Sequence, residues 1–134
     1  MRVMLDTNVL ISAFVFDSFR MNKVIENIIY ENKLILSSYV VDELKLVVEK
    51  KFVGKKEILD EFLTALPFEL VYTPDKIDKK LFEIRDESDY PVLYSAILED
   101  VDILITGDKD FFDVEIEKPE ILTPVQYYEK YVRK

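Results

Sequence analysis

Carboxylate side chains stand at the ends of strand-like apolar runs in this sequence. Asp6 follows the run 2–5, and Asp108 and Asp110 follow the run 103–105. The chain contains no histidine and no cysteine, so any metal that it binds would have oxygen ligands only. Carboxylate oxygens are the ligands that Mg²⁺, Mn²⁺ and Ca²⁺ prefer in proteins. These acids therefore predict a site for a hard divalent cation.

Two further acids have comparable positions. Glu43 lies on the second turn of a helix that is expected to begin after the apolar run 34–36, and Asp89 precedes an apolar helix. Each acid alone has an ordinary explanation, as a helix cap for Asp6, Asp89 or Asp108 and as a surface residue for Glu43. Several carboxylates at one edge of a sheet would repel one another unless a cation lies between them. Their joint placement favours the metal site.

Short apolar runs alternate with longer stretches of helical spacing along the whole chain. The expected strands are 2–5, 34–36, 68–72, 102–106 and 121–122. The expected helices are 21–29, 39–51, 55–66, 75–85, 88–99 and 124–132, with a short turn or helix at 109–112. Apolar strands separated by helices are typical of a parallel sheet that is covered on both faces. We therefore expect a three-layer α/β/α fold, whose ligand crevice lies at the carboxyl ends of the strands.

Length and composition indicate one globular domain over residues 1–134. The chain is 49% hydrophobic, contains two glycines and five prolines, and has no repeated or low-complexity segment. None of its apolar stretches reaches the roughly 20 residues that a membrane span requires. We expect a soluble, cytoplasmic protein.

The formal net charge of −9 argues at first against a nucleic-acid substrate, because phosphate backbones are normally bound by an excess of lysine and arginine. Basic residues nevertheless form three clusters along the chain. They are Lys50, Lys51, Lys55 and Lys56, then Lys76, Lys79 and Lys80, and finally Lys130, Arg133 and Lys134. Solvated helix faces are the ordinary explanation for such clusters. A carboxylate site loaded with divalent cations would reverse the local sign of the charge, so the net charge does not exclude a phosphate substrate.

Four stretches occur in a definite order along nearly the whole chain. They are Met4–Ser12, with the sequence MLDTNVLIS, then Ser37–Leu44, then Asp89 with the apolar helix after it, and finally Ile103–Phe111, with the sequence ILITGDKDF. Together they resemble the motifs of the PIN domain family, in particular its VapC-like branch of toxins from toxin–antitoxin pairs. The resemblance implies the PIN-like variant of the Rossmann-like α/β fold.

The resemblance also assigns roles to individual residues. The acidic quartet that would bind the metal and catalyse is implied to be Asp6, Glu43, Asp89 and Asp108, with Asp110 as a fifth metal ligand and Asn8 and Thr106 as polar supports. Asp86 lies one helical turn before Asp89 and could replace or assist it. The implied activity is a ribonuclease that depends on Mg²⁺ or Mn²⁺ and cuts single-stranded RNA. A homodimer and a small antitoxin protein are the implied partners.

Other classes of protein remain open from the sequence. A phosphatase of the haloacid dehalogenase type also has an aspartate after its first strand, but it needs a second aspartate where this chain has Asn8. A receiver domain needs an acidic pair and a later lysine that we cannot place. The stronger alternatives keep the PIN fold, either as a non-catalytic binding module or as an RNA-processing nuclease outside a toxin–antitoxin pair.

Overall fold

Five parallel strands form the central sheet of the protein, in the order β3-β2-β1-β4-β5. The computed structural model describes residues 1–133. The strands are β1 (Arg2–Leu5), β2 (Lys33–Ser37), β3 (Glu69–Val71), β4 (Ile103–Ile105) and β5 (Glu120–Leu122). The predicted parallel sheet is confirmed, and each of the five predicted strands is present.

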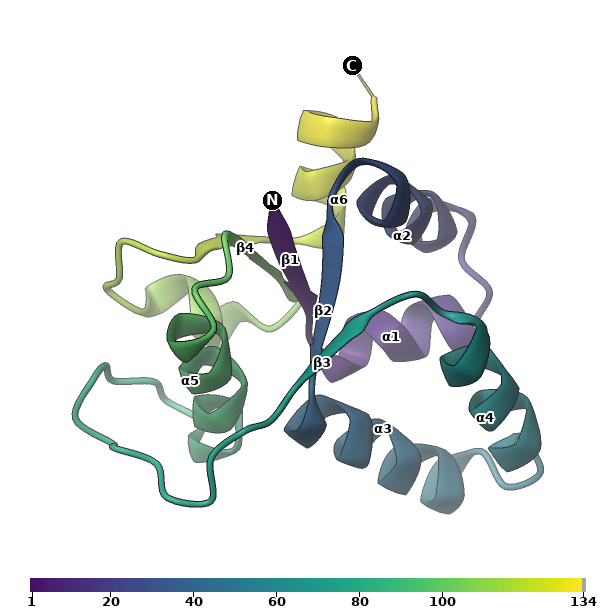
Figure 1. Cartoon of the computed structure of the whole chain (residues 1–134), viewed down its shortest axis with the longest axis horizontal. Helices are drawn as coiled ribbons and strands as arrows, with labels where there is room; N and C mark the ends of the chain where they lie inside the picture. Colours follow the sequence, from purple (N-terminus) through teal and green to yellow (C-terminus); the bar gives the residue numbers. More distant parts are fainter. Residues whose placement is uncertain (134) are drawn as a thin grey trace.

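Helices cover both faces of this sheet. They are α1 (Thr7–Phe14), α2 (Phe19–Glu31), α3 (Ser38–Lys51), α4 (Lys56–Ala65), α5 (Tyr90–Leu98) and α6 (Pro124–Tyr127), followed by a π-helical turn, η3 (Tyr128–Val132). Two short 3₁₀ helices, η1 (Glu87–Asp89) and η2 (Lys109–Asp113), flank the carboxyl end of the sheet. Figure 1 shows α5 on one side of the sheet and α1, α2 and α4 on the other. The predicted three-layer architecture is confirmed.

The central strands are apolar because both of their faces are covered. All residues of Val3–Leu5 and Ile103–Ile105 are buried, as expected for a parallel sheet between two helical layers. Strand β1 lies between β2 and β4. From β1 the chain runs to β2 and β3 on one side, and only then crosses to β4 on the other side, so the connections diverge at β1. Such a point opens a crevice at the carboxyl ends of the two strands, here β1 and β4.

The predicted helix over 75–85 is wrong. Residues 72–86 have an irregular conformation, and the local hydrogen bonds explain why. The side chain of Asp78 accepts a hydrogen bond from the backbone N–H two residues later (3.0 Å), which closes a turn. The hydroxyl of Tyr90 donates to the carbonyl of Asp78 (2.6 Å) and accepts from the N–H of Leu81 (3.2 Å). Side-chain partners thus take the backbone groups that a helix would use, which the apolar spacing does not reveal.

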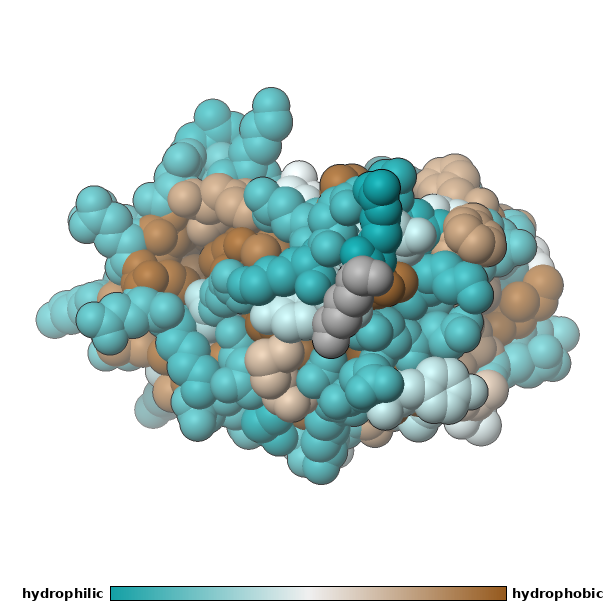
Figure 2. Space-filling view, turned by 90° about the horizontal axis from the view of Figure 1, so that it is seen from above, coloured by the Kyte–Doolittle hydropathy of each residue, from teal (hydrophilic) through white to brown (hydrophobic). Residues whose placement is uncertain are grey.

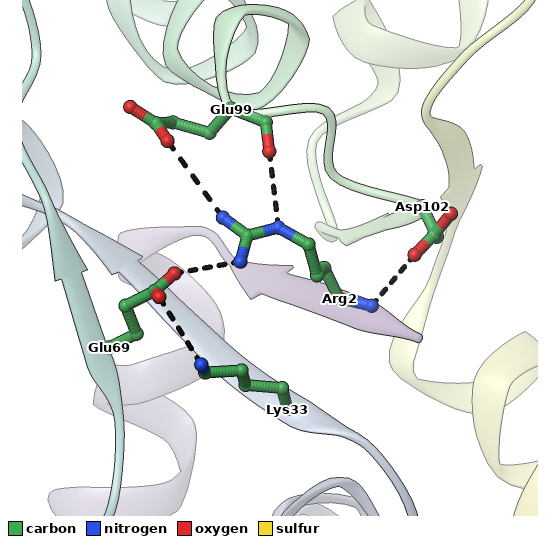
Figure 3. A network of polar contacts seen from close by, with 5 residues as sticks. All are labelled: Arg2, Lys33, Glu69, Glu99 and Asp102. Carbon is green, nitrogen blue, oxygen red and sulfur yellow. Dashed lines mark hydrogen bonds and ion pairs between the residues drawn. The ribbon is translucent and has the colours of Figure 1, made fainter.

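An ion-pair network connects four elements at the amino ends of the strands (Figure 3). The guanidinium of Arg2 donates to Glu69 Oε2 (2.8 Å) and to the backbone carbonyl of Glu99 (3.1 Å). The backbone N–H of Arg2 donates to Asp102 Oδ2 (2.8 Å), and Lys33 Nζ lies 3.3 Å from Glu69 Oε1. This network connects β1, β2, β3 and the segment between α5 and β4. The carboxylates at this end of the sheet therefore have cationic partners.

Replacing Arg2 with alanine is expected to lower the melting temperature by about 3–5 °C, because several partly exposed polar contacts are lost together. The decrease should be smaller at 1 M NaCl, where salt screens the ion pairs of the wild-type protein. Thermal unfolding at low and high salt measures both effects. Arg20→Ala removes an exposed arginine that forms none of the ion pairs within residues 1–133 and is the control; an equal decrease in that variant would contradict the prediction.

The surface seen from the side of the C-terminal helix is mostly hydrophilic, with apolar residues in separate patches (Figure 2). Within residues 1–133, each helix is too short or too polar to cross a lipid bilayer.

Candidate metal centre

Asp6 forms the centre of the candidate site. It follows β1 directly, and the residue is 5% exposed. Asp6 Oδ1 accepts a hydrogen bond from the N–H of Thr7 (2.7 Å), which caps α1, and Oδ2 accepts one from Thr106 Oγ1 (2.8 Å). Burial raises the pKa of Asp6, although these hydrogen bonds counteract the rise, and the nearby carboxylates of Glu43 and Asp108 raise it further. The carboxylate is thus held in place where its charge is unfavourable.

Glu43 reaches the site from α3. Ser37 Oγ accepts from the N–H of Val40 (3.2 Å) and so caps α3, which places Glu43 on its second turn beside α1. The hydroxyl of Thr7, the first residue of α1, donates to Glu43 Oε1. Thr7 therefore joins Asp6 to Glu43, through its N–H on one side and its hydroxyl on the other. No role for Thr7 was predicted from the sequence. The order Asp6, Thr7, Asn8 does not show whether Thr7 or Asn8 faces the site.

The side chain of Asn8 is exposed and makes none of the hydrogen bonds found in residues 1–133. Its supporting role therefore stays a prediction.

Asp108 approaches Asp6 from the next strand. Thr106, fully buried at the end of β4, donates to Asp6 Oδ2 and accepts a hydrogen bond from the N–H of Asp108 (3.1 Å). Asp108 Oδ1 accepts from the N–H of Asp110 (2.9 Å) and so caps the short helix η2. A single threonine hydroxyl thus connects the two acids that follow β1 and β4.

Asp89 has the least favourable environment of these acids. Its Oδ2 atom is buried without a hydrogen-bond partner. Its pKa is raised to about 8, and burial is the largest cause. The adjacent Asp108 is the next cause, followed by the charges of Asp6 and Asp86. Two carboxyl groups can form a hydrogen bond with each other only when one of them holds a proton. Within the predicted quartet, Asp6 is therefore repelled by Glu43 and Asp108, and Asp89 by Asp108 and Asp6. The structure does not bring three of the four within 4.8 Å of one another among the described residues.

A second, overlapping group extends toward the solvent. One oxygen from each of Asp86, Asp89 and Asp110 lies within 4.8 Å of the others. Asp86 also caps η1, because its Oδ1 accepts from the N–H (3.0 Å) and the hydroxyl (2.8 Å) of Ser88. These hydrogen bonds lower the pKa of Asp86. Asp86 and Asp89 thus lie in the same group. The sequence spacing alone could not show whether Asp86 assists Asp89 or takes its place.

Tyr39 connects α3 to η1, a role that the sequence pattern did not indicate. Its hydroxyl donates to the backbone carbonyl of Ser88 (3.1 Å), the residue before Asp89. Burial raises the pKa of Tyr39, and the carboxylates of Glu43 and Asp89 add to the rise. Tyr39 therefore holds η1 against the helix that carries Glu43.

The residues fit a divalent cation. An unpartnered carboxylate oxygen that is buried among other carboxylates costs free energy unless a proton or a cation neutralises it. The donors are all oxygens, which suits Mg²⁺ or Mn²⁺ and does not suit a soft metal.

Replacing Thr106 with valine is expected to weaken Mn²⁺ binding about tenfold to a hundredfold, because residues that orient metal-binding carboxylates typically contribute that much. It should also destabilise the protein by about 1–3 kcal/mol, since Asp6 Oδ2 and the N–H of Asp108 both lose a buried partner. Calorimetric titration and urea unfolding measure the two effects. Thr106→Ser keeps the hydroxyl and should retain most of the affinity; a loss as large as that of the valine variant would contradict the role of the hydroxyl.

The fold and the site together define an α/β protein whose carboxylates gather at the switch point of a parallel sheet. The model of the family described as PIN domain matches residues 2–110, so the chain belongs to the PIN domain family. Comparison with curated proteins gives no match. Among solved structures, the chain is similar to one in the crystal structure of VapBC2 from Rickettsia felis bound to a DNA fragment from their promoter. The two share 26% sequence identity with a TM-score of 0.69, over 91% of this chain and 97% of that chain.

Proposed function

We propose that this protein is an endoribonuclease that depends on Mg²⁺ or Mn²⁺ and serves as the VapC-like toxin of a toxin–antitoxin pair. The observation that carries the proposal is the buried, unpartnered Oδ2 of Asp89 among the carboxylates of Asp6, Asp86 and Asp108. The membership of the PIN domain family and the similarity to a chain of the VapBC2 structure support it.

The side chains would divide the work as follows. Asp6 and Asp108 would be the main metal ligands, because Thr106 holds both in a fixed relation. Glu43 and Asp89 would complete the ligand set or orient the attacking water, and Asp110 would be a further ligand. When bound, the cation lowers the pKa of a coordinated water and offsets the charge that develops at the phosphate. Thr7 and Thr106 would keep the carboxylates of Glu43 and Asp6 in place, with Asn8 as a further polar support.

Single-stranded RNA is the proposed substrate, with a small antitoxin as the regulatory partner, a homodimer as the assembly and the cytoplasm as the place of action. VapBC2 from Rickettsia felis was crystallised bound to a DNA fragment from their promoter, and the similarity to it favours an antitoxin partner for this chain as well. An RNA-processing nuclease without an antitoxin would use the same site and would differ only in its partners.

Cleavage of a labelled pool of single-stranded RNA tests the activity. We expect cleavage with Mn²⁺ that stops when a chelator is added, and products with a 5′-phosphate and a 3′-hydroxyl, because water is the proposed nucleophile. A 2′,3′-cyclic phosphate would contradict the mechanism, since it shows attack by the substrate's own hydroxyl. Uptake of Mn²⁺ without cleavage of any RNA would instead favour a non-catalytic binding module.

A further inference from the structure

Arg85 forms an ion pair with one of the acids of the candidate site. Its Nε lies 3.3 Å from Asp110 Oδ1, and no other ion pair within residues 1–133 involves an acid of the two carboxylate groups. The side chain of Arg85 is nevertheless 88% exposed, whereas that of Asp110 is 15% exposed. An exposed guanidinium thus reaches a largely buried carboxylate of the site.

The position of Arg85 follows from the irregular conformation of residues 72–86. A helix over 75–85 would have made Arg85 one of its last residues. Instead the backbone at Asp86 is extended (φ −95°, ψ 114°), and Asp86 caps η1 directly after Arg85. The chain therefore presents Arg85 beside Asp86, and Asp86 has an oxygen within 4.8 Å of oxygens of Asp89 and Asp110.

The ion pair between Arg85 and Asp110 is easily broken. Exposed ion pairs contribute little to stability, because water solvates both charges and the long side chain loses freedom when it is held. A guanidinium carries five N–H donors in a planar fork, and the closest contact with Asp110 here is made by Nε. This exposed fork matches the oxygens of a phosphate, to which arginine binds through two parallel hydrogen bonds.

We propose that Arg85 is a substrate-binding residue that pairs with Asp110 in the free protein and transfers to a phosphate of the bound RNA when a divalent cation occupies the carboxylates. The proposal deepens the proposed function and rests on it. A cation bound to Asp110 competes with the guanidinium for the same carboxylate, so the ligand that completes the site also releases Arg85. The arginine precedes Asp86 in the chain and contacts Asp110, and both acids belong to this carboxylate group. It would thereby supply a positive charge for RNA in a chain whose net charge is −9.

Arg85→Ala is the test, with two measurements on the full chain. Steady-state cleavage of a labelled single-stranded RNA with Mn²⁺ should show KM raised about tenfold. The dependence of log KM on log salt should also become shallower by about one unit, as expected when one phosphate contact is lost. Titration with Mn²⁺ alone, followed by calorimetry, should show affinity that is unchanged or up to about threefold tighter, since a competing cation has been removed.

Two further variants make the result specific. Arg133→Ala removes another exposed arginine with one carboxylate partner, Glu129, and should leave KM, the salt dependence and Mn²⁺ affinity unchanged. Arg85→Lys keeps the charge but loses the fork, so it should recover the salt dependence and only part of the affinity.

Several outcomes would overturn the proposal. Weaker Mn²⁺ binding in Arg85→Ala would show that Arg85 helps to build the metal site, and unchanged KM and salt dependence would show that it does not contact RNA. In both cases a wild-type protein that cleaves RNA leaves the proposed function intact. A wild-type protein that neither binds nor cleaves RNA refutes the proposed function itself, and the role of Arg85 with it.

Discussion

Replacing Asp6 with asparagine is expected to lower the rate of RNA cleavage at least about a thousandfold, which corresponds to about 4 kcal/mol of transition-state stabilisation. Asparagine keeps the size of the side chain but replaces one anionic oxygen with an N–H₂ group, which cannot accept the hydrogen bond from Thr106 or bind a cation. Calorimetric titration should show Mn²⁺ affinity weakened at least about tenfold.

The same variant is expected to remain folded. The lost hydrogen bond destabilises the protein, but the removal of a buried charge near Glu43 and Asp108 relieves repulsion and offsets that loss. Asp113→Asn removes an exposed carboxylate at the end of η2 and is the matched control, for which we expect wild-type cleavage. A folded Asp6→Asn protein with wild-type cleavage or Mn²⁺ uptake would refute the metal site.

The metal-free protein is expected to lose stability as the pH rises from 5 to 8. The pKa of Asp89 is raised from 3.8 to about 8 in the folded protein, so between these values the folded state holds a proton that the unfolded state has released. Stability from this group is therefore complete below 3.8 and is lost progressively up to about pH 8. The raised pKa of Asp6 acts in the same direction. The pKa values of Glu69, Asp86 and Asp102 are lowered, so these groups change the stability only at pH values below their ordinary pKa. They do not affect the stability between pH 5 and 8.

We expect the free energy of unfolding to fall by about 1–3 kcal/mol over this range in the presence of a chelator, after allowance for the solvent that screens the half-buried Asp89. Urea unfolding at a series of pH values measures it. Mn²⁺ should abolish the decrease, because a bound cation favours the ionised carboxylates and stabilises the folded state by mass action.

Asp89→Asn tests the origin of the pH effect. The variant should be more stable than the wild type at pH 8 without metal and should show a flatter pH dependence, whereas Asp113→Asn should retain the wild-type slope. If Asp89→Asn keeps the full slope, the pH dependence originates in other groups and the pKa of Asp89 is not raised.

The sheet and the acids that follow its strands could be predicted from the sequence because short apolar runs determine where buried strands end. Asp6, Thr106 and Asp108 come directly after such runs, and the phase of an amphipathic helix places Glu43. The edge where these residues meet then follows from the general geometry of parallel sheets.

Other features depend on contacts between segments that are distant in sequence. The spacing of apolar residues over 75–85 is helical, yet Tyr90 takes the backbone groups of Asp78 and Leu81 and prevents the helix. Thr7 contacts Glu43 only because α1 and α3 are neighbours in space. The approach of Arg85 to Asp110 likewise depends on the path of an irregular segment, for which periodicity carries no information.

The two ends of the sheet differ in how their acids are neutralised. At the amino ends of the strands, Arg2 and Lys33 form ion pairs with Glu69 (Figure 3), and Lys118 forms one with Asp102. At the carboxyl ends, Asp6 and Asp89 have no such companions among the ion pairs of residues 1–133. Substitutions around Arg2 can therefore change the stability of the fold without changing the carboxylates at the opposite end of the sheet. Variants made more heat-resistant around Arg2 should accordingly keep the proposed RNA cleavage at its wild-type rate.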